Sequence, residues 1–183
     1  REAVMSPHQP LTLPRTGHVL ENRSVVAAMT NKQSHKDGTL SDEEIKWLVR
    51  RAKDGFAITT TAAANVTELG RGWKGEMGVW SDNQLPGLTK MATLLNETGT
   101  LSLAQIFHGG MRASKSLNGV QPVSASENTE DGMDGLYTRA LTHEEVLAMI
   151  QSFTDAAVRC QKAGFDGVEL HGAHSYLICQ FLG

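Results

Sequence analysis

Residues 164–176 read Gly-Phe-Asp-Gly-Val-Glu-Leu-His-Gly-Ala-His-Ser-Tyr, and this stretch decides the fold that the sequence predicts. Its first glycine stops a helix, and Val168 and Leu170 then predict a buried parallel strand. In α/β folds, ligands bind outside the carboxyl ends of the strands. Three polar side chains follow at the end of this strand and are the first candidates for chemistry: His171, His174 and Tyr176.

The composition is that of a globular protein. The chain has 183 residues, of which 40% are hydrophobic and 20% charged, which predicts one domain and excludes extensive disorder. The net charge is −3, so the chain lacks the excess of positive charge that binds nucleic acid or an anionic membrane. No stretch approaches the roughly 20 apolar residues of a membrane span. We therefore expect neither nucleic acid nor a membrane as a partner.

The cysteines and the start of the chain indicate the compartment. Cys160 and Cys179 are too few for a disulfide framework and form no Cys-x-x-Cys motif. They predict two reduced thiols in a cytoplasmic protein. The first ten residues lack the apolar core of a signal peptide. The chain begins with Arg1 rather than Met, which suggests a fragment or a processed product.

Strand and helix signals alternate along the rest of the chain, without a hairpin signal. Capping boxes begin two helices, at Ser41 with Glu44 and at Thr142 with Glu145. We predict an extended lead-in over 1–22, strands over 24–29, 56–61 and 101–107, and helices from Ser41 to Gly55, Pro86 to near Gly99 and Thr142 to Gly164. This order predicts an α/β fold with a parallel sheet and right-handed crossovers. The long loops follow strands (62–85 and 108–141), as on the functional face of a (β/α)-barrel.

One motif matches a cofactor fingerprint but lies in the wrong place. Residues 70–75 read Gly-Arg-Gly-Trp-Lys-Gly, which fits G-x-G-x-x-G. A dinucleotide fingerprint must end a strand and begin a helix. Here the motif begins about ten residues past the strand, and residues 76–80 do not have apolar side chains at the spacing of a helix. We therefore expect a flexible loop and not a Rossmann site.

The two histidines leave three interpretations open. Imidazoles so placed can share a Zn²⁺ ion, with Glu169 able to occupy the same side of the strand as His171. They can also be a purely structural pair. The favoured interpretation is a polar pocket in which two neutral imidazoles donate N–H groups to a carbonyl oxygen that gains negative charge. The hydroxyl of Tyr176, protonated at neutral pH because a phenol has a pKa near 10, supplies a proton to carbon.

Other polar residues at strand ends have weaker signals. Gln105 lies inside an otherwise apolar strand, where an unpaired amide costs about 1–3 kcal/mol; a planar heterocycle satisfies it, and so does neighbouring backbone. Thr30 can bond a ligand edge or be a plain loop residue. His108 and Arg112 stay ambiguous. The remaining histidines are expected on the surface: His8, His18, His35 and His143.

These residues together resemble the N-terminal half of the old yellow enzyme family, the FMN-dependent NADH:flavin oxidoreductases on a (β/α)8 TIM barrel. The matching pieces are 22–30 (Asn-Arg-Ser-Val-Val-Ala-Ala-Met-Thr), 105–112 (Gln-Ile-Phe-His-Gly-Gly-Met-Arg) and 164–182. The last is the most specific. By this resemblance the chain is an α/β protein that covers about the first four β/α units of an FMN-binding barrel over 1–183.

The resemblance implies two groups of site residues and no site metal. The cofactor group is Ala28, Met29, Thr30, Ala62, Ala63, Gln105 and His171, with Gln105 on the pyrimidine edge of the flavin. The catalytic group is His171 and His174, which would hold the carbonyl oxygen of the substrate, and Tyr176, the proton donor. NADH or NADPH would reduce FMN, and reduced FMN would pass hydride to the β-carbon of an activated alkene.

The resemblance also has departures. Ala28 stands where the family usually has Pro, and Ser175 where it often has Gly. Four strands cannot close a barrel that takes eight, at about 250 residues, so two open edges are expected. The chain alone is therefore expected to bind FMN poorly unless two copies pair, which leaves a homo-oligomer open. The alternatives are a non-catalytic half-barrel fragment without the phosphate-binding half, and a metal-dependent enzyme that uses His171 and His174.

Overall fold

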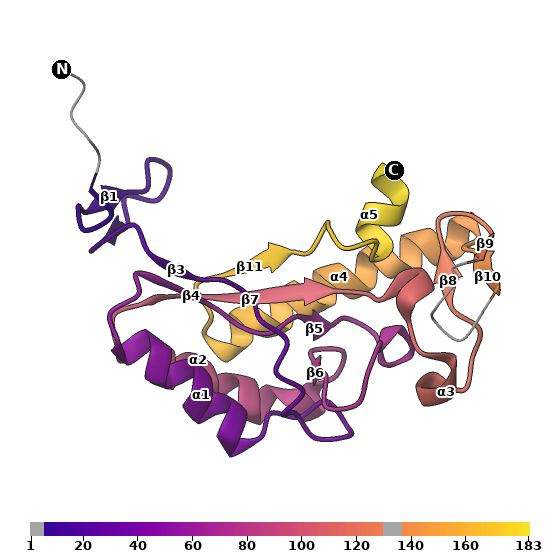
Figure 1. Ribbon diagram of the computed structural model, residues 1–183, viewed down its shortest axis with the longest axis horizontal. Helices are drawn as coiled ribbons and strands as arrows, with labels where there is room; N and C mark the ends of the chain where they lie inside the picture. Colours follow the sequence, from indigo (N-terminus) through magenta and orange to yellow (C-terminus); the bar gives the residue numbers. More distant parts are fainter. Residues whose placement is uncertain (1–5, 130–136) are drawn as a thin grey trace.

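The computed structural model describes residues 6–129 and 137–183. Its centre is a parallel sheet in which four strands lie in the spatial order β3, β4, β7, β11 (Figure 1). Their bounds are Val25–Val26 for β3, Ile58–Thr60 for β4, Leu101–Phe107 for β7 and Gly167–Leu170 for β11. Each strand lies next to the one before it in the barrel order. The predicted parallel α/β sheet is therefore confirmed.

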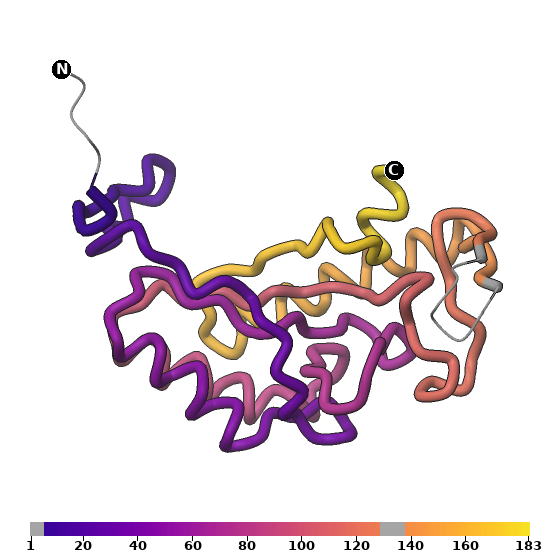
Figure 2. The backbone as a smooth tube through the Cα atoms, in the orientation of Figure 1, coloured from indigo at the N-terminus to yellow at the C-terminus, as the bar shows by residue number. Residues whose placement is uncertain are grey.

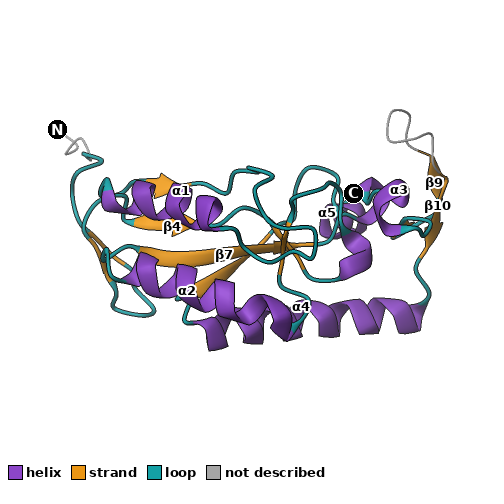
Figure 3. Cartoon of the chain, turned by 90° about the horizontal axis from the view of Figure 1, so that it is seen from below, coloured by secondary structure: helices purple, strands orange, loops and turns teal. Residues whose placement is uncertain are grey.

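Helices connect these strands and supply the core. They are α1 (Asp42–Lys53), α2 (Leu85–Asn96) and α4 (His143–Ala163), and they run alongside the strands in Figure 3. The hydroxyls of Ser41 and Thr142 accept the predicted capping bonds from the backbone N–H groups of Glu44 and Glu145. Gly164 ends α4 with φ +98°, a conformation that costs glycine little. The core lies between this helix layer and one face of β7, where Ala104 and Ile106 are fully buried.

The two outer strands are less buried than the sequence predicts. Val25 is 49% exposed and Leu170 is 61% exposed, although both belong to strands predicted as buried. Only Val26 of the first strand is buried, and this strand is two residues long instead of six. Within the part of the chain that the structure describes, β3 pairs only with β4 and β11 only with β7. The prediction was wrong here because each strand has one open edge.

A bulge interrupts the second strand close to its carboxyl end. Both β4 and a short continuation, β5 (Ala64–Asn65), pair with β7. Thr60 pairs with Leu103 and Ala64 pairs with Ile106. The chain therefore advances by four residues from β4 to β5 while β7 advances by three. One extra residue is thus accommodated within 61–63. The bulge moves two predicted cofactor residues, Ala62 and Ala63, out of the regular ladder.

The predicted extended lead-in contains a small hairpin. Strands β1 (Leu11–Thr12) and β2 (Val19–Leu20) pair antiparallel, and Gly17 turns the chain between them with φ +72°. The hairpin lies beside the amino ends of the sheet strands (Figure 2). Its strands are too short to give an alternating hydrophobic pattern, which is why the sequence carried no signal for them.

The two long loops hold short elements at the carboxyl end of the sheet. The first contains η1 (Glu68–Gly70), β6 (Met77–Gly78) and η2 (Asp82–Gln84); the second contains η3 (Gly110–Arg112), α3 (Lys115–Asn118), β8 (Val123–Ser124), β9 (Asn128–Thr129) and β10 (Tyr137–Ala140). The glycine motif at 70–75 leads into β6 and not into a helix, which confirms that it is no Rossmann fingerprint. Residues 130–136 of the second predicted loop lie outside the described residues. A last helix, α5 (Leu177–Leu182), follows β11, and no helix in the described ranges has the length and hydropathy to cross a membrane.

Candidate active site at the carboxyl end of the sheet

The three polar residues after β11 lie together. The ring centroids of His171 and His174 are 5.0 Å apart, those of His171 and Tyr176 are also 5.0 Å apart, and those of His174 and Tyr176 are 6.2 Å apart. His171 is buried and Tyr176 is half-buried, whereas His174 is exposed. The cluster therefore has a closed inner side and an open outer side from which a ligand can approach.

Hydrogen bonds assign the protons of the two imidazoles. The backbone N–H of Ala173 donates to Nδ1 of His171 at 3.3 Å, so a neutral His171 carries its proton on Nε2. That Nε2 lies 3.1 Å from Nδ1 of His174, which then accepts. A neutral His174 consequently carries its own proton on Nε2. Only one of the two imidazole N–H groups is thus available to a ligand in this arrangement, whereas the sequence predicted two.

The surroundings keep both His171 and Tyr176 in their neutral forms. Burial, with a smaller contribution from His174, lowers the pKa of His171 below its ordinary 6.5. Burial likewise raises the pKa of the Tyr176 phenol above its ordinary 10, and Arg112 opposes this shift. A neutral imidazole and a protonated phenol are the forms that hydrogen-bond donation and proton delivery require.

A strained turn presents His174. His174 and Ser175 both have positive φ angles, 56° and 55°, which non-glycine residues adopt at a cost. Neighbouring segments hold the turn: the guanidinium of Arg112 donates to the carbonyl of His174 at 3.3 Å. The N–H of Leu177 donates to the carbonyl of His108 at 3.0 Å. The two residues that the sequence left ambiguous therefore support the site from the loop after β7.

Two aromatic residues outside the predicted site, Phe107 and Trp73, lie next to the polar cluster. The ring of Phe107 lies 4.9 Å from that of Tyr176, edge to face, and it is fully buried. Trp73 stacks on Phe107, with their ring centroids 5.8 Å apart. Trp73 comes from the glycine-containing loop that was expected only to be flexible. Its place in a loop after a strand was the available signal, because such loops meet at one face.

Gln105 is satisfied by a side chain and not by backbone. Its Nε2 donates to Oε1 of Glu169 at 2.5 Å, across the register pair that β7 and β11 form. Both side chains thus project from the sheet face opposite the helix layer. Gln105 is half-buried, so part of its side chain is exposed on this face of the sheet.

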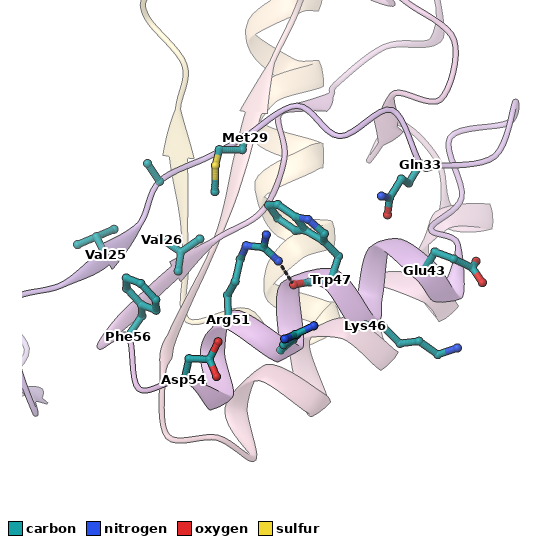
Figure 4. A pocket seen from close by; sticks show the side chains of 12 residues that line it. Val25, Val26, Met29, Gln33, Glu43, Lys46, Trp47, Arg51, Asp54 and Phe56 are labelled. Carbon is teal, nitrogen blue, oxygen red and sulfur yellow. Dashed lines mark hydrogen bonds between the residues drawn. The ribbon is translucent and has the colours of Figure 1, made fainter.

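The other predicted cofactor residues fall into two places. Thr30, Ala62 and Ala63 line one small cavity at the carboxyl end of the sheet, together with Trp73 and Glu76. Met29 is 42% exposed and instead lines a groove beside α1 with Val25 and Trp47 (Figure 4). Ala28, which precedes Met29 in the chain, is half-buried and lines neither of these two places. The structure brings together Thr30 and the two alanines, and it directs the side chain of Met29 elsewhere.

A buried carboxylate underlies this cavity. Glu76 is 3% exposed, and its oxygens accept hydrogen bonds from the amide of Asn65 at 2.6 Å and the N–H of Gly72 at 2.8 Å. The same Asn65 amide donates to the carbonyl of Gly70 at 2.7 Å. These bonds hold the loop that carries Trp73. Burial raises the pKa of Glu76 to about 7.

The remaining predictions concern metal binding and single residues. The described residues hold no group of three or more His, Cys, Asp or Glu side chains placed to ligate a metal ion; Glu169, the suggested third ligand, bonds Gln105. Both cysteines are free thiols. The four histidines that were expected on the surface are exposed, and His108 is buried with its pKa lowered to about 4.

The fold and the site define a class. A parallel strand–helix sheet with a polar cluster past the carboxyl ends of its strands is the arrangement of (β/α)-barrel enzymes. Residues 8–183 match the model of the NADH:flavin oxidoreductase / NADH oxidase family. The chain belongs to this family.

Individual relatives agree with this assignment. The chain is 38% identical to a probable NADH-dependent flavin oxidoreductase of Bacillus subtilis over 94% of its own length and 46% of that protein. It is 37% identical to an NADH:fumarate oxidoreductase of Klebsiella pneumoniae over 94% of its length and 19% of that protein. An old yellow enzyme homologue from Zymomonas mobilis superimposes with a TM-score of 0.86 at 26% identity, over 94% of this chain and 50% of the other. The chain therefore spans about half or less of these relatives, which fits a partial barrel.

Proposed function

We propose that this chain forms the substrate side of an FMN-dependent NAD(P)H oxidoreductase that reduces the activated C=C bond of an α,β-unsaturated carbonyl compound. The convergence of His171, His174 and Tyr176 beyond one strand end carries this proposal. FMN, when bound, supplies the hydride chemistry that these side chains lack. The relative from Klebsiella pneumoniae is named for fumarate, which is an alkene activated by carboxylates.

The histidine pair is assigned to the carbonyl oxygen of the substrate. The free Nε2–H of His174 donates directly, and His171 donates once its bond to His174 opens. Donors aimed at an oxygen that gains charge are worth about 2.7–4 kcal/mol each in comparable sites. Because His171 is neutral, it contributes a hydrogen bond without holding a permanent charge beside the substrate.

Tyr176 is assigned as the proton donor. Its ring is fixed by the edge-to-face contact with Phe107 and by the histidines, so the hydroxyl has a defined position. Its raised pKa keeps the proton in place across the neutral range. A positioned acid of this kind contributes about 10²–10⁴-fold to a rate.

The donor set at the sheet face fits a flavin. Gln105 offers an amide with both a donor and an acceptor. Thr30, an exposed residue that follows β3, lines a small cavity with Ala62 and Ala63. Ala62 and Ala63 sit at the bulge with side chains of one carbon, so the backbone there can be approached closely. We assign Gln105 to the pyrimidine edge and Thr30 with the two alanines to the ring.

The test is alkene reduction by the FMN-loaded protein that contains this chain. NADPH and NADH are supplied in turn with a cyclic enone, and nicotinamide oxidation is followed with and without the enone. Enone-dependent oxidation that Tyr176→Phe abolishes would support the proposal. Oxidation that proceeds equally without the enone, or that the variant leaves unchanged, would contradict it.

A second candidate is a half-barrel fragment without catalytic activity. The exposed Val25 and Leu170 at the two open strands favour it, because a barrel closes such edges. Purified residues 1–183 distinguish the two: we expect little yellow flavin absorbance from this chain alone. Stoichiometric FMN would contradict that expectation, and chromatography would then show whether paired copies, the homo-oligomer left open above, provide the missing edges.

A further inference from the structure

We propose that the cavity between the loop 31–40 and the loop 66–76 binds the phosphate groups of an extended nucleotide ligand whose reacting end lies at Tyr176. This inference rests on the proposed function for the position of the reacting end only. The ligand class is a molecule with a diphosphate at a distance from its reactive carbon. A nicotinamide dinucleotide reductant and a coenzyme A thioester of an unsaturated acid share this chemistry.

The cavity has a volume of about 250 Å³ and a strongly basic lining. Four of its residues carry basic side chains: His35, Lys36, Arg71 and Lys74. Lys36 and Lys74 are exposed, so their ammonium groups can reach a ligand. The chain as a whole has a net charge of −3, which makes this local excess of positive charge a feature of the cavity and not of the general surface.

The walls are held in place by hydrogen bonds between the two loops. Arg71, whose side chain is 13% exposed, donates from Nη1 to the carbonyl of Lys36 and from Nε to that of Glu68, both at 2.9 Å. The N–H of Ser34 donates to the carbonyl of Gly75 at 3.1 Å. Gly75 has φ +77°, and an added Cβ would lie 2.3 Å from a backbone oxygen of the opposite loop. The two loops therefore pack closely against each other, and their hydrogen bonds fix the shape of the cavity.

Acidic groups offset only part of the positive charge of the cavity. Asp37 and Asp42 interact electrostatically with His35, which leaves Lys36, Lys74 and Arg71 as the cations of the lining. Glu68 lies 3.4 Å from Arg71 and neutralises part of that guanidinium. Glu76 lines the cavity but is 3% exposed, and its oxygens already accept bonds from Asn65 and Gly72. Both lysines line the cavity, so an anion that enters meets two cations and the remaining N–H groups of Arg71. Phosphate groups suit such a set of donors.

Trp73 connects this cavity to the candidate active site. Its side chain lines the cavity, and its ring stacks on Phe107, which in turn contacts Tyr176. Two ring contacts therefore lead from the lining of the cavity to the proton donor. A carboxylate bonded directly to the alkene cannot reach past both rings. Phosphate groups on a flexible linker can, which selects an extended ligand.

The first experiment needs neither flavin nor turnover. Binding of inorganic pyrophosphate to the purified chain is measured by calorimetry and by quenching of tryptophan fluorescence. The double variant Lys36→Ala, Lys74→Ala is compared with Lys53→Ala, Lys162→Ala, which removes the same charge from exposed positions on α1 and α4. We expect the first variant to lose roughly tenfold or more in affinity and the control to lose less than about twofold.

Equal losses in both variants, or no binding of pyrophosphate at millimolar concentration, would overturn the site. NADH and coenzyme A are then added as competitors, and the one that displaces pyrophosphate identifies the source of the phosphates. Displacement by neither would overturn the assignment to an extended nucleotide. In the FMN-loaded protein, the lysine variant should raise KM for that ligand and leave KM for an uncharged enone unchanged; an equal rise for both would also contradict the proposal. Failure of alkene reduction itself leaves the pyrophosphate result intact, so the two proposals fail separately.

Discussion

Nε2 of His171 lies 3.1 Å from Nδ1 of His174, so the two imidazoles are bonded to each other. The N–H of Ala173 directs this arrangement, because it occupies Nδ1 of His171 and leaves the proton on Nε2. The pair is therefore a connected donor unit with one free N–H at its exposed end. A ligand that engages both histidines must first open this bond.

The coupling of the pair can be measured by a double-mutant cycle. We expect His171→Ala and His174→Ala each to lower kcat/KM for enone reduction by about 10²-fold, and the double variant to lose much less than the product. The reason is that removing either ring already disrupts the shared unit. Rates of flavin reduction by NAD(P)H serve as the control for a general structural effect. Losses that simply multiply would show that the two imidazoles act independently.

Tyr176→Phe removes the phenolic proton while keeping the ring contact with Phe107. We expect the rate of alkene reduction to fall by about 10²–10⁴-fold and flavin reduction by NAD(P)H to remain near the wild-type rate. Because burial raises the pKa of Tyr176 above 10, the wild-type protonation step should stay independent of pH up to about pH 9. Stopped-flow absorbance of the flavin separates the two half-reactions. A matched loss in both would point to misplacement of the flavin instead.

The carboxyl of Glu76 should make stability depend on pH. Its pKa rises from an ordinary 4.5 to about 7 in the folded chain, chiefly through burial. Below pH 4.5 the group is protonated in both states, and the unfolding free energy is highest there. As pH rises to about 7, the unfolded chain releases the proton first, which lowers the unfolding free energy by up to about 3 kcal/mol.

Urea denaturation between pH 4.5 and pH 7.5 tests this dependence. The variant Glu76→Gln should remove most of the slope, and Glu97→Gln, at an exposed position after α2, should leave it as in the wild type. Near-ultraviolet circular dichroism should also change for Glu76→Gln, because Glu76 holds the loop that carries Trp73. An unaltered slope in Glu76→Gln would mean that other groups control the pH response.

Gln105 and Glu169 offer a test of flavin binding. We expect Gln105→Ala to weaken FMN binding by about 10-fold, in line with the loss of one hydrogen bond at a partly buried amide. Glu169→Ala should weaken it less, because Glu169 only orients the Gln105 amide. Fluorescence titration of FMN with the complete FMN-binding protein gives both affinities. A larger effect of Glu169→Ala would reverse these two roles.

Local sequence signals determined the order of strands and helices. The capping boxes at Ser41 and Thr142 and the terminal Gly164 act within one turn of their helices, so they could be recognised without any tertiary contact. The position of His171, His174 and Tyr176 was predictable for the same reason. They follow one strand directly, and a single turn brings them together.

The tertiary structure decided which side chains contact each other in the candidate site, because the contacting residues come from distant segments of the chain. Gln105 meets Glu169 only through the register of β7 with β11. Trp73 reaches Phe107 only because two loops after different strands meet at one end of the sheet. The exposure of Leu170 was equally invisible, since its hydrophobic character is the same whether or not a neighbour covers it. The sequence by itself determined the fold class and the place of the candidate site after β11. The pairing of strands decided which donors remain free, because hydrogen bonds and burial depend on neighbours that no local pattern records.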